Sequence, residues 1–369
     1  MKKTIAFIIP ILLIFGCTET GPSGPEADNF DREEMLENWA DNLIIPAFTN
    51  FSETTGQLHD DAVTFSENPS AGTLADLRES WEDAYLAFQH VAMFEKGKPM
   101  ELRFRDNLNI YPIDTDEIEN SIQSGEYNLE LPSLTDSQGF PALDYLLNGL
   151  GESDDSILEH YKTHENSDGY REYITDLTRR IDDLTTEVLD DWTDGYRDEF
   201  VSNSGNGANS SLDMMVNDYI FYYEKHLRTG KIGIPAGVFS GSPISSTVEA
   251  YYSRGLSKEL FFEGMQASVN FFNGFHFENG SEGLSLNDYL EYLNTTRDGD
   301  DLASVINNQF EVASTQAEEL HDDFAHQVET DNSLMLSTFD ALQQNVVFLK
   351  VDMLQALNIN VDYVDADGD

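Results

Sequence analysis

One carboxylate stands out in the stretch QGFPALDYLLNG (residues 138–149), because Asp144 is surrounded there by apolar residues. A glycine precedes it, and Pro141 falls where the first turn of a helix would be, a position at which the missing N–H of proline has no partner to lose. A carboxylate in apolar surroundings can bind a hard cation, exchange a proton or pair with a buried donor. The stretch therefore predicts either a short core helix or a helix whose Asp144 carries chemistry.

Few other residues have the spacing of a reaction centre. His160 and His164 lie four apart, with Glu159 and Glu165 beside them, and could hold a metal on one helix face. Such pairs arise by chance in an acidic helical chain, so we favour the ordinary interpretation. The last residues, DADGD (365–369), resemble the start of a calcium loop without its later ligands, and we interpret them as a polar terminus. The zinc-peptidase pattern HExxH and the hydrolase pattern Gly-x-Ser-x-Gly are both missing from the sequence.

The charge is strongly unbalanced, with 69 acidic and 20 basic residues. A surface of this sign excludes nucleic acid as a partner, since phosphate binding needs a basic face. The excess fits either cation binding or a solvated surface suited to high salt, where like charges are screened. Because the acids are spread along the whole chain, we favour the solvated surface.

The first residues predict export. MKKTIAFIIPILLIFGC has two lysines, an apolar run and a small residue before Cys17, which is typical of a signal peptide over residues 1–16. The ending resembles a lipoprotein processing site, so we expect Cys17 to be lipidated and residues 17–30 to form a tether. Ordinary secretion with a spare Cys17 is the alternative. Cys17 is the only cysteine, so the mature chain would have no disulfide and no thiolate site.

Apolar residues three, four or seven apart predict helices almost throughout. We expect helices over residues 31–65 (bent at Pro46), 73–91 (capped by Thr73), 168–192, 212–227, 258–275, 286–293, 301–328 and 333–357, and loops over residues 98–125, 202–211 and 231–246. Alternating strand patterns are nearly absent. The sequence thus predicts an all-α protein of two helical bundles, divided into residues 31–203 and 204–369.

Four stretches in order along the chain resemble the imelysin family of bacterial envelope lipoproteins, also classed as M75 peptidases. They are SWEDAYLAFQHVAMFEKGK, NIYPIDTDEIENSI, QGFPALDYLLNG, and KIGIPAGVFSGSP followed by VEAYYSRGLSKELF. The resemblance covers essentially the whole mature chain. It implies two packed helical bundles with a cleft between them. It also implies iron-linked binding or uptake at the cell envelope and, for some members, protease activity.

The family signature is Gly-x-His-x-x-Glu, and this chain departs from it. Gly139 matches the glycine, whereas Pro141 stands in place of the histidine and Asp144 in place of the glutamate. Proline has no side-chain donor or acceptor, so the change weakens a zinc-type peptidase more than it weakens binding of a hard cation. Five residues could line the cleft with polar or aromatic groups: Trp81, Tyr85, His90, Glu95 and Arg103. For His90 we favour the ordinary interpretation of a half-buried histidine that is hydrogen-bonded to a neighbour.

Three hypotheses remain open. The chain could capture iron, another hard cation or a small ligand through Asp144; it could be an M75-type metallopeptidase with an altered site; or it could be a non-catalytic surface interaction lipoprotein. We favour the first, and whether the protein is an enzyme stays open, with an M75-like peptidase as the alternative. We expect the protein to be anchored through Cys17 at the periplasmic face or cell surface, in the outer membrane, and to act with envelope uptake partners.

Overall fold

Helices make up nearly all the regular structure of this chain, for which a computed structural model describes residues 28–363. The predictions for the signal peptide, for Cys17, for the tether up to residue 27 and for DADGD therefore lie outside the described residues. The only strands in the described part are β1 (Thr296–Arg297) and β2 (Asp300–Asp301), an antiparallel pair. The all-α prediction is confirmed. Of the helices described, none combines the length and the apolar character that crossing a membrane requires.

The helices up to residue 202 position most of the site. They are α1 (Arg32–Asn38), η1 (Trp39–Ile44), α2 (Ile45–Glu67), α3 (Ala71–Gln89), α4 (Lys98–Leu102), α5 (Phe104–Leu108), α6 (Thr115–Ser124), η2 (Pro132–Ser137), α7 (Gly139–Asp144), η3 (Tyr145–Gly149), α8 (Asp154–Lys162), α9 (Ser167–Asp191), η4 (Trp192–Tyr196) and α10 (Arg197–Ser202).

The remaining helices follow an eight-residue connection at residues 203–210, where the sequence predicts a loop. They are α11 (Ser211–Phe221), η5 (Tyr222–Gly233), η6 (Ser245–Thr247), α12 (Ser257–Asn273), α13 (Leu286–Tyr292), α14 (Leu302–Glu318), α15 (Phe324–Thr330), α16 (Asn332–Val347), η7 (Phe348–Met353) and α17 (Leu354–Leu357). The segments η2 and η6 are 3₁₀ helices, and the other η segments are π helices.

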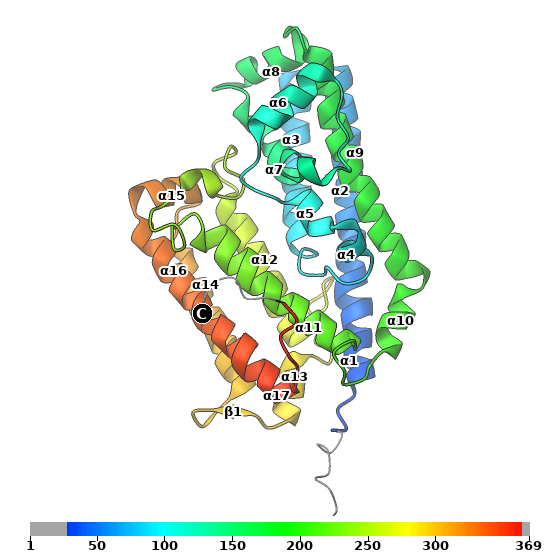
Figure 1. The fold of residues 1–369 in the computed structure, drawn as a ribbon, viewed down its shortest axis with the longest axis vertical. Coiled ribbons are helices and arrows are strands. Elements are labelled where there is room, and N and C mark those ends of the chain that lie inside the picture. The colour runs from blue at the N-terminus through cyan, green and yellow to red at the C-terminus, as the bar shows by residue number, and fades with distance from the viewer. Residues whose placement is uncertain (1–27, 364–369) are drawn as a thin grey trace, which may run out of the picture. The chain divides into compact units, whose positions relative to one another are not determined.

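The long helices α2, α3 and α9 lie side by side (Figure 1). Their facing stripes are buried, as their apolar spacing predicts, with Phe51 on α2, Trp81 on α3 and Ile181 on α9 among the residues in the core. The cap of α3 differs from the prediction. Ser70 is the N-cap, and it forms a reciprocal capping box with Thr73, which lies three residues further on.

The helix predicted over residues 31–65 is continuous, but its irregular part begins before the proline. Residues Trp39–Ile44 form a π helix, and Pro46 lies in the first turn of α2. Pro46 has no N–H, and the carbonyl of Asn42, four residues earlier, accepts a hydrogen bond of 2.8 Å from the N–H of Phe277. A distant segment thus satisfies a carbonyl that the proline cannot.

In the C-terminal half, α14 packs against α16 (Figure 1). The segment η5 also contacts α16, and α12 contacts α3. From Asp31 onward the described residues form one compact unit. The boundary between residues 203 and 204 stays a prediction.

Two predictions of secondary structure were wrong, one of a loop and one of a single long helix. Residues 98–125, expected as a long loop, contain α4, α5 and α6. The helix α6 is amphipathic, begins at an Asp114 cap and ends at Gly125 in the left-handed conformation, so local signals were present, but only Ile118, Ser121 and Ile122 are buried and the apolar stripe is short. The helix expected over residues 301–328 is divided, because α14 ends at Glu318 and α15 begins only after an Asp323 cap.

Candidate functional site

The helix α7 begins at a point where only glycine fits. Gly139 has φ +75°, and a Cβ there would lie 2.2 Å from the carbonyl oxygen of Leu108. The positive φ and the close backbone approach each exclude a larger residue. All six residues of α7 are buried, including Pro141 in the first turn. The glycine therefore allows α7 to be pressed against the end of α5, with Asp144 at its far end.

An aromatic cluster holds α7 from the core side. The ring of Phe140 stacks on that of Tyr85, with centroids 4.6 Å apart and planes 8° apart. Phe51 and Phe88 also contact Phe140, at centroid distances of 6.1 and 5.6 Å. Trp81 adds a hydrogen bond of 3.2 Å from its Nε1 to the carbonyl of Phe140. The apolar stripe of α3 thus positions the helix that carries Asp144.

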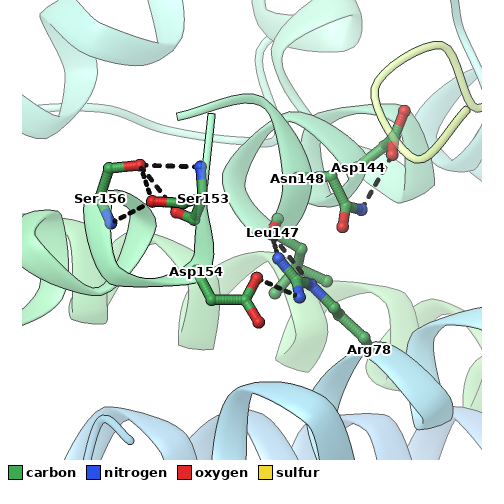
Figure 2. A network of polar contacts seen from close by, with 7 residues as sticks. All are labelled: Arg78, Asp144, Leu147, Asn148, Ser153, Asp154 and Ser156. Atoms are coloured by element: carbon green, nitrogen blue, oxygen red, sulfur yellow. Dashed lines mark hydrogen bonds and ion pairs between the residues drawn. The ribbon is translucent and has the colours of Figure 1, made fainter. Parts of the chain in front are cut away.

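Polar side chains fix the π-helical segment η3 that follows. Arg78, from α3, donates to the carbonyl of Leu147 through Nε at 3.1 Å and through Nη2 at 2.7 Å, and its Nη1 pairs with Asp154 at 2.8 Å. Figure 2 draws these contacts as dashed lines. The hydroxyl of Tyr161 donates to the carbonyl of Leu146 at 2.8 Å. Ser153 and Ser156, also drawn in Figure 2, form the capping box that starts α8. These contacts satisfy carbonyls that a regular α-helix would use internally.

Asp144 is the centre of the site. Its side chain is 1% exposed. Oδ2 accepts a hydrogen bond of 2.8 Å from the N–H of Tyr252, and Oδ1 accepts bonds of 2.9 Å from the N–H of Ser253 and 3.1 Å from Asn148 Nδ2 (Figure 2 shows Asn148). Burial raises the pKa of Asp144 to about 7, against the opposing effect of these three donors. The carboxyl can therefore hold or release a proton near neutral pH.

A cavity of about 220 Å³ opens beside Asp144. Its walls come from the segment before α6, from α7 and from the segment between η6 and α12. The lining residues are Tyr111, Pro112, Ile113, Thr115, Pro141, Asp144, Ser246, Val248, Ala250, Tyr251 and Tyr252. Apolar groups and phenols predominate, and Asp144 is the one carboxyl among the lining residues. Such a cavity suits a small molecule with an apolar body and one polar group.

A second polar cluster lies next to this cavity. The carboxylate of Glu249 forms a buried ion pair with Lys231 and accepts bonds of 2.7 Å from Asn109 Nδ2 and 3.2 Å from the hydroxyl of Tyr85. The Tyr85 hydroxyl also lies 2.5 Å from Asn109 Oδ1. Burial, followed by the charge of Glu249, raises the pKa of Tyr85 well above its ordinary value, so the phenol stays a donor.

Sequence reasoning missed Asn109, Lys231, Glu249 and Tyr252. One signal was present for two of them, because Lys231 and Glu249 border a run without any charged residue at positions 232–248. Charges that flank an uncharged stretch in such an acidic chain are candidates for burial in a pair. Nothing local indicates that they bind each other.

The five suggested lining residues are not brought to one place. Trp81 and Tyr85 support Phe140 and Glu249, as described. His90 pairs with Glu263 at 2.7 Å, and Glu95 lies near Arg105 and Asp218, with burial raising the pKa of Glu95 to about 8. Arg103 is half-exposed, pairs with Asp106 at 2.9 Å and lines a different, larger cavity.

The donor set around Asp144 does not fit a bound metal ion. Both oxygens already accept N–H donors, and within residues 28–363 there is no group of three or more His, Cys, Asp or Glu side chains placed to hold a metal ion. Hard cations need several oxygen ligands. His160 and His164 stack with ring centroids 5.4 Å apart, and Tyr170 contacts both rings.

Comparisons with known proteins agree on the family. Among solved structures, an iron-regulated protein A precursor from Parabacteroides distasonis is similar with a TM-score of 0.73 and 15% identity, over 91% of this chain and 98% of that one. An imelysin-like protein from Psychrobacter arcticum is similar with a TM-score of 0.67 and 16% sequence identity, over 91% of this chain and 99% of that one. No curated protein matches this chain. The family model described as Imelysin (Peptidase M75) matches residues 44–347. Because that match spans more than half of the sequence, the chain belongs to the Imelysin family.

Proposed function

We propose that this protein is an envelope binding protein that captures a small organic ligand in the cavity beside Asp144. One observation carries the proposal: a fully buried carboxyl, with a pKa of about 7, forms part of the wall of a cavity otherwise lined by apolar groups, hydroxyls and phenols. A protein that only needed a stable core would favour an apolar residue there, because burying a carboxyl costs free energy. The hydrogen-bonded Asp144 is instead held ready for a ligand.

The lining narrows the class of ligand. A volume of about 220 Å³ admits a molecule of a few ring or chain atoms. Tyr111, Tyr251 and Tyr252 offer ring faces and hydroxyls, and Asp144 offers one hydrogen-bonding carboxyl. We therefore propose a small, partly apolar ligand that carries a hydroxyl or a basic group. Charged anions are disfavoured because they would face Asp144.

Iron or another hard cation would bind to such a ligand and be carried with it. It would not bind directly to Asp144, because the groups around Asp144 do not fit a bare ion. The phenols of Tyr111 and Tyr252 also argue against direct binding of a bare cation. Burial raises the pKa of Tyr111 well above its ordinary value and also raises that of Tyr252, so neither ring readily becomes a phenolate ligand. The structural neighbour named as iron-regulated makes iron the first cargo to test.

The setting we propose is the cell envelope, with the protein anchored through lipidated Cys17 at the outer membrane and passing its ligand to uptake partners. The signal-like residues 1–16 and the family support this setting. We do not adopt a peptidase function. Pro141 replaces the histidine of the family signature, and the donors of Asp144 leave no open position for a catalytic metal.

The test compares three probes on the soluble chain from Asp28: catechol, ferric ion, and catechol with ferric ion. Titration calorimetry is run at low and at 1 M salt, because the acidic surface attracts cations loosely. We expect catechol to bind with one site that persists in high salt, and the ferric ion alone to bind only loosely. Asp144→Ala should lower the affinity for catechol at least tenfold. Asp190→Ala, which removes an exposed carboxylate from α9, should leave that affinity unchanged.

The proposal fails if catechol does not bind or if both variants bind it equally. Tight binding of the ferric ion alone that Asp144→Ala abolishes would replace it with direct metal capture. Cleavage of a protein substrate by the wild type, lost on chelation and in Asp144→Ala, would instead establish the peptidase.

A further inference from the structure

A groove of about 590 Å³ lies on the N-terminal half, away from Asp144, and shares no lining residue with the cavity described above. One wall is a stripe of α9 that includes Asp176, Arg179, Arg180 and Asp183. The other walls are the end of α4 with Arg103, residues 127–130, and Pro132 at the start of η2. Its volume lies in the range of small-molecule sites.

Arginines gather here in a chain that has few cations. Arg103 pairs with Asp106 at 2.9 Å, and Arg179 pairs with Asp176 through Nη2. Arg180 differs from both. Within the described part of the chain no carboxylate lies within 4.0 Å of its guanidinium, although the protein carries 69 acidic residues. Burial lowers the pKa of Arg180, which still leaves an arginine charged.

A buried amide holds Arg180 in place. Nε of Arg180 donates to Gln138 Oε1 at 2.6 Å. Gln138 is 1% exposed, and its Nε2 donates to the carbonyls of Leu129 at 2.9 Å and Leu134 at 3.1 Å. These two bonds orient the amide so that its oxygen faces the guanidinium. The Nη nitrogens make no hydrogen bond to any described residue, so the arginine is oriented while its forked end is left open to the groove.

Carboxylates stand near Arg180 without touching it. Asp183 and Glu130 are close enough for their charges to raise the pKa of the guanidinium, but each remains beyond ion-pair distance. Glu187, on the same stripe of α9, pairs with Lys98 at 3.6 Å. A purely anionic ligand would be repelled by these acids, and a purely cationic ligand would be repelled by Arg180. The two signs together suit a molecule that carries both.

We propose that this groove binds a small zwitterion, an amino acid or a short peptide, with its carboxylate on the Arg180 fork and its ammonium toward Asp183 and Glu130. The fork geometry of arginine matches a carboxylate bidentately. The side chains of Leu102, Leu129 and Leu184 supply apolar lining for the body of the ligand. Gln138 is a positioning residue, and it immediately precedes Gly139, the start of α7. The proposal does not depend on the function assigned to Asp144.

The test uses alanine and trialanine as probes, each also with an acetylated amino group or an amidated carboxyl group. Binding to the full soluble chain is measured by titration calorimetry. We expect at least one unmodified probe to bind with one site and either modification to weaken it at least tenfold. Alanine binding as tightly as trialanine identifies a free amino acid as the ligand, and preference for trialanine identifies a peptide.

Variants separate recognition from folding. Arg180→Lys keeps the positive charge but loses the two Nη donors that can bind a carboxylate together. It should lower the affinity for the probe at least tenfold with little change in Tm. Asp183→Asn changes an exposed residue and should weaken the unmodified probe but not its acetylated form. Lys162→Gln is the matched control and should bind as the wild type does. Lys162 is an exposed cation that, like Arg180, has no carboxylate at ion-pair distance among residues 28–363.

The proposal is overturned if neither unmodified probe binds, if the amidated peptide binds as well as the free acid, or if Arg180→Lys and Lys162→Gln behave alike. The proposal is also overturned if inorganic phosphate displaces the probe and still binds to the Asp183→Asn variant. The site would then recognise anions alone.

Discussion

Asp144, the last residue of α7, accepts a hydrogen bond of 2.8 Å from the backbone N–H of Tyr252, which lies 108 residues further along the chain. The neighbouring N–H of Ser253 donates to the other carboxylate oxygen at 2.9 Å. One side chain thus binds two successive backbone donors of a segment without regular structure. The cavity wall at Ala250, Tyr251 and Tyr252 depends on that carboxyl for its position.

The first prediction concerns pH. The folded pKa of Asp144, about 7, is above the ordinary value of 3.8, so the protonated carboxyl favours the folded state. Its contribution is complete below pH 4 and is lost as the pH rises to 7, at about 1.4 kcal/mol per pH unit at most. In urea unfolding, the wild type should therefore lose stability relative to Asp144→Asn between pH 5 and pH 7. If the free energy of unfolding changes with pH in the same way in both proteins, the pKa of Asp144 is not raised.

The second prediction concerns Gly139. Gly139→Ala places a Cβ against the carbonyl of Leu108 at a φ of +75°, so α7 must shift or the chain must strain. We expect a loss of about 2 kcal/mol or more in the free energy of unfolding. Gly205→Ala is the control, because a Cβ there meets no atom within 4 Å. Equal stability of the two variants would mean that the close approach at Leu108 is not rigid.

The third prediction concerns Arg78. Arg78→Gln removes two hydrogen bonds to the carbonyl of Leu147 and the pair with Asp154. Losing charged donors to a part-buried carbonyl should cost about 1–3 kcal/mol. Arg179→Gln removes an exposed pair with Asp176 on α9 and should cost less than about 0.5 kcal/mol. Urea unfolding of both variants checks this, and similar losses would show that the Leu147 contacts contribute little.

The fourth prediction concerns the buried pair of Lys231 and Glu249, whose side chains are 3% and 2% exposed. Removing one charge leaves the other buried without its partner, so Lys231→Met and Glu249→Gln should each cost about 3–5 kcal/mol. The double variant should cost less than the sum of the two. A double-mutant cycle in urea unfolding measures the coupling, and strict additivity would show that the two charges do not stabilise each other.

Local patterns in the sequence were sufficient for most of the helices. The stripes of α2, α3 and α9 follow from apolar residues recurring every three or four positions, a property of neighbouring residues alone. Short helices give a weaker signal: α4, α5 and α6 lie where the sequence predicts a loop, because each offers few periods of the pattern. The resemblance to imelysins, carried by four stretches in order, predicted the family correctly.

The sequence by itself determined that the chain is helical, that it belongs to the Imelysin family, and that Asp144 stands at the altered signature. Only the tertiary structure decided which groups surround it. Tyr252, Ser253 and Asn148 bind Asp144, Lys231 finds Glu249, and Arg180 is left facing a groove. Apart from that of Asn148, these arrangements join residues far apart in the chain. Hydrogen bonds and ion pairs act over a few ångströms, so their partners are set by how the helices pack and not by spacing in the sequence.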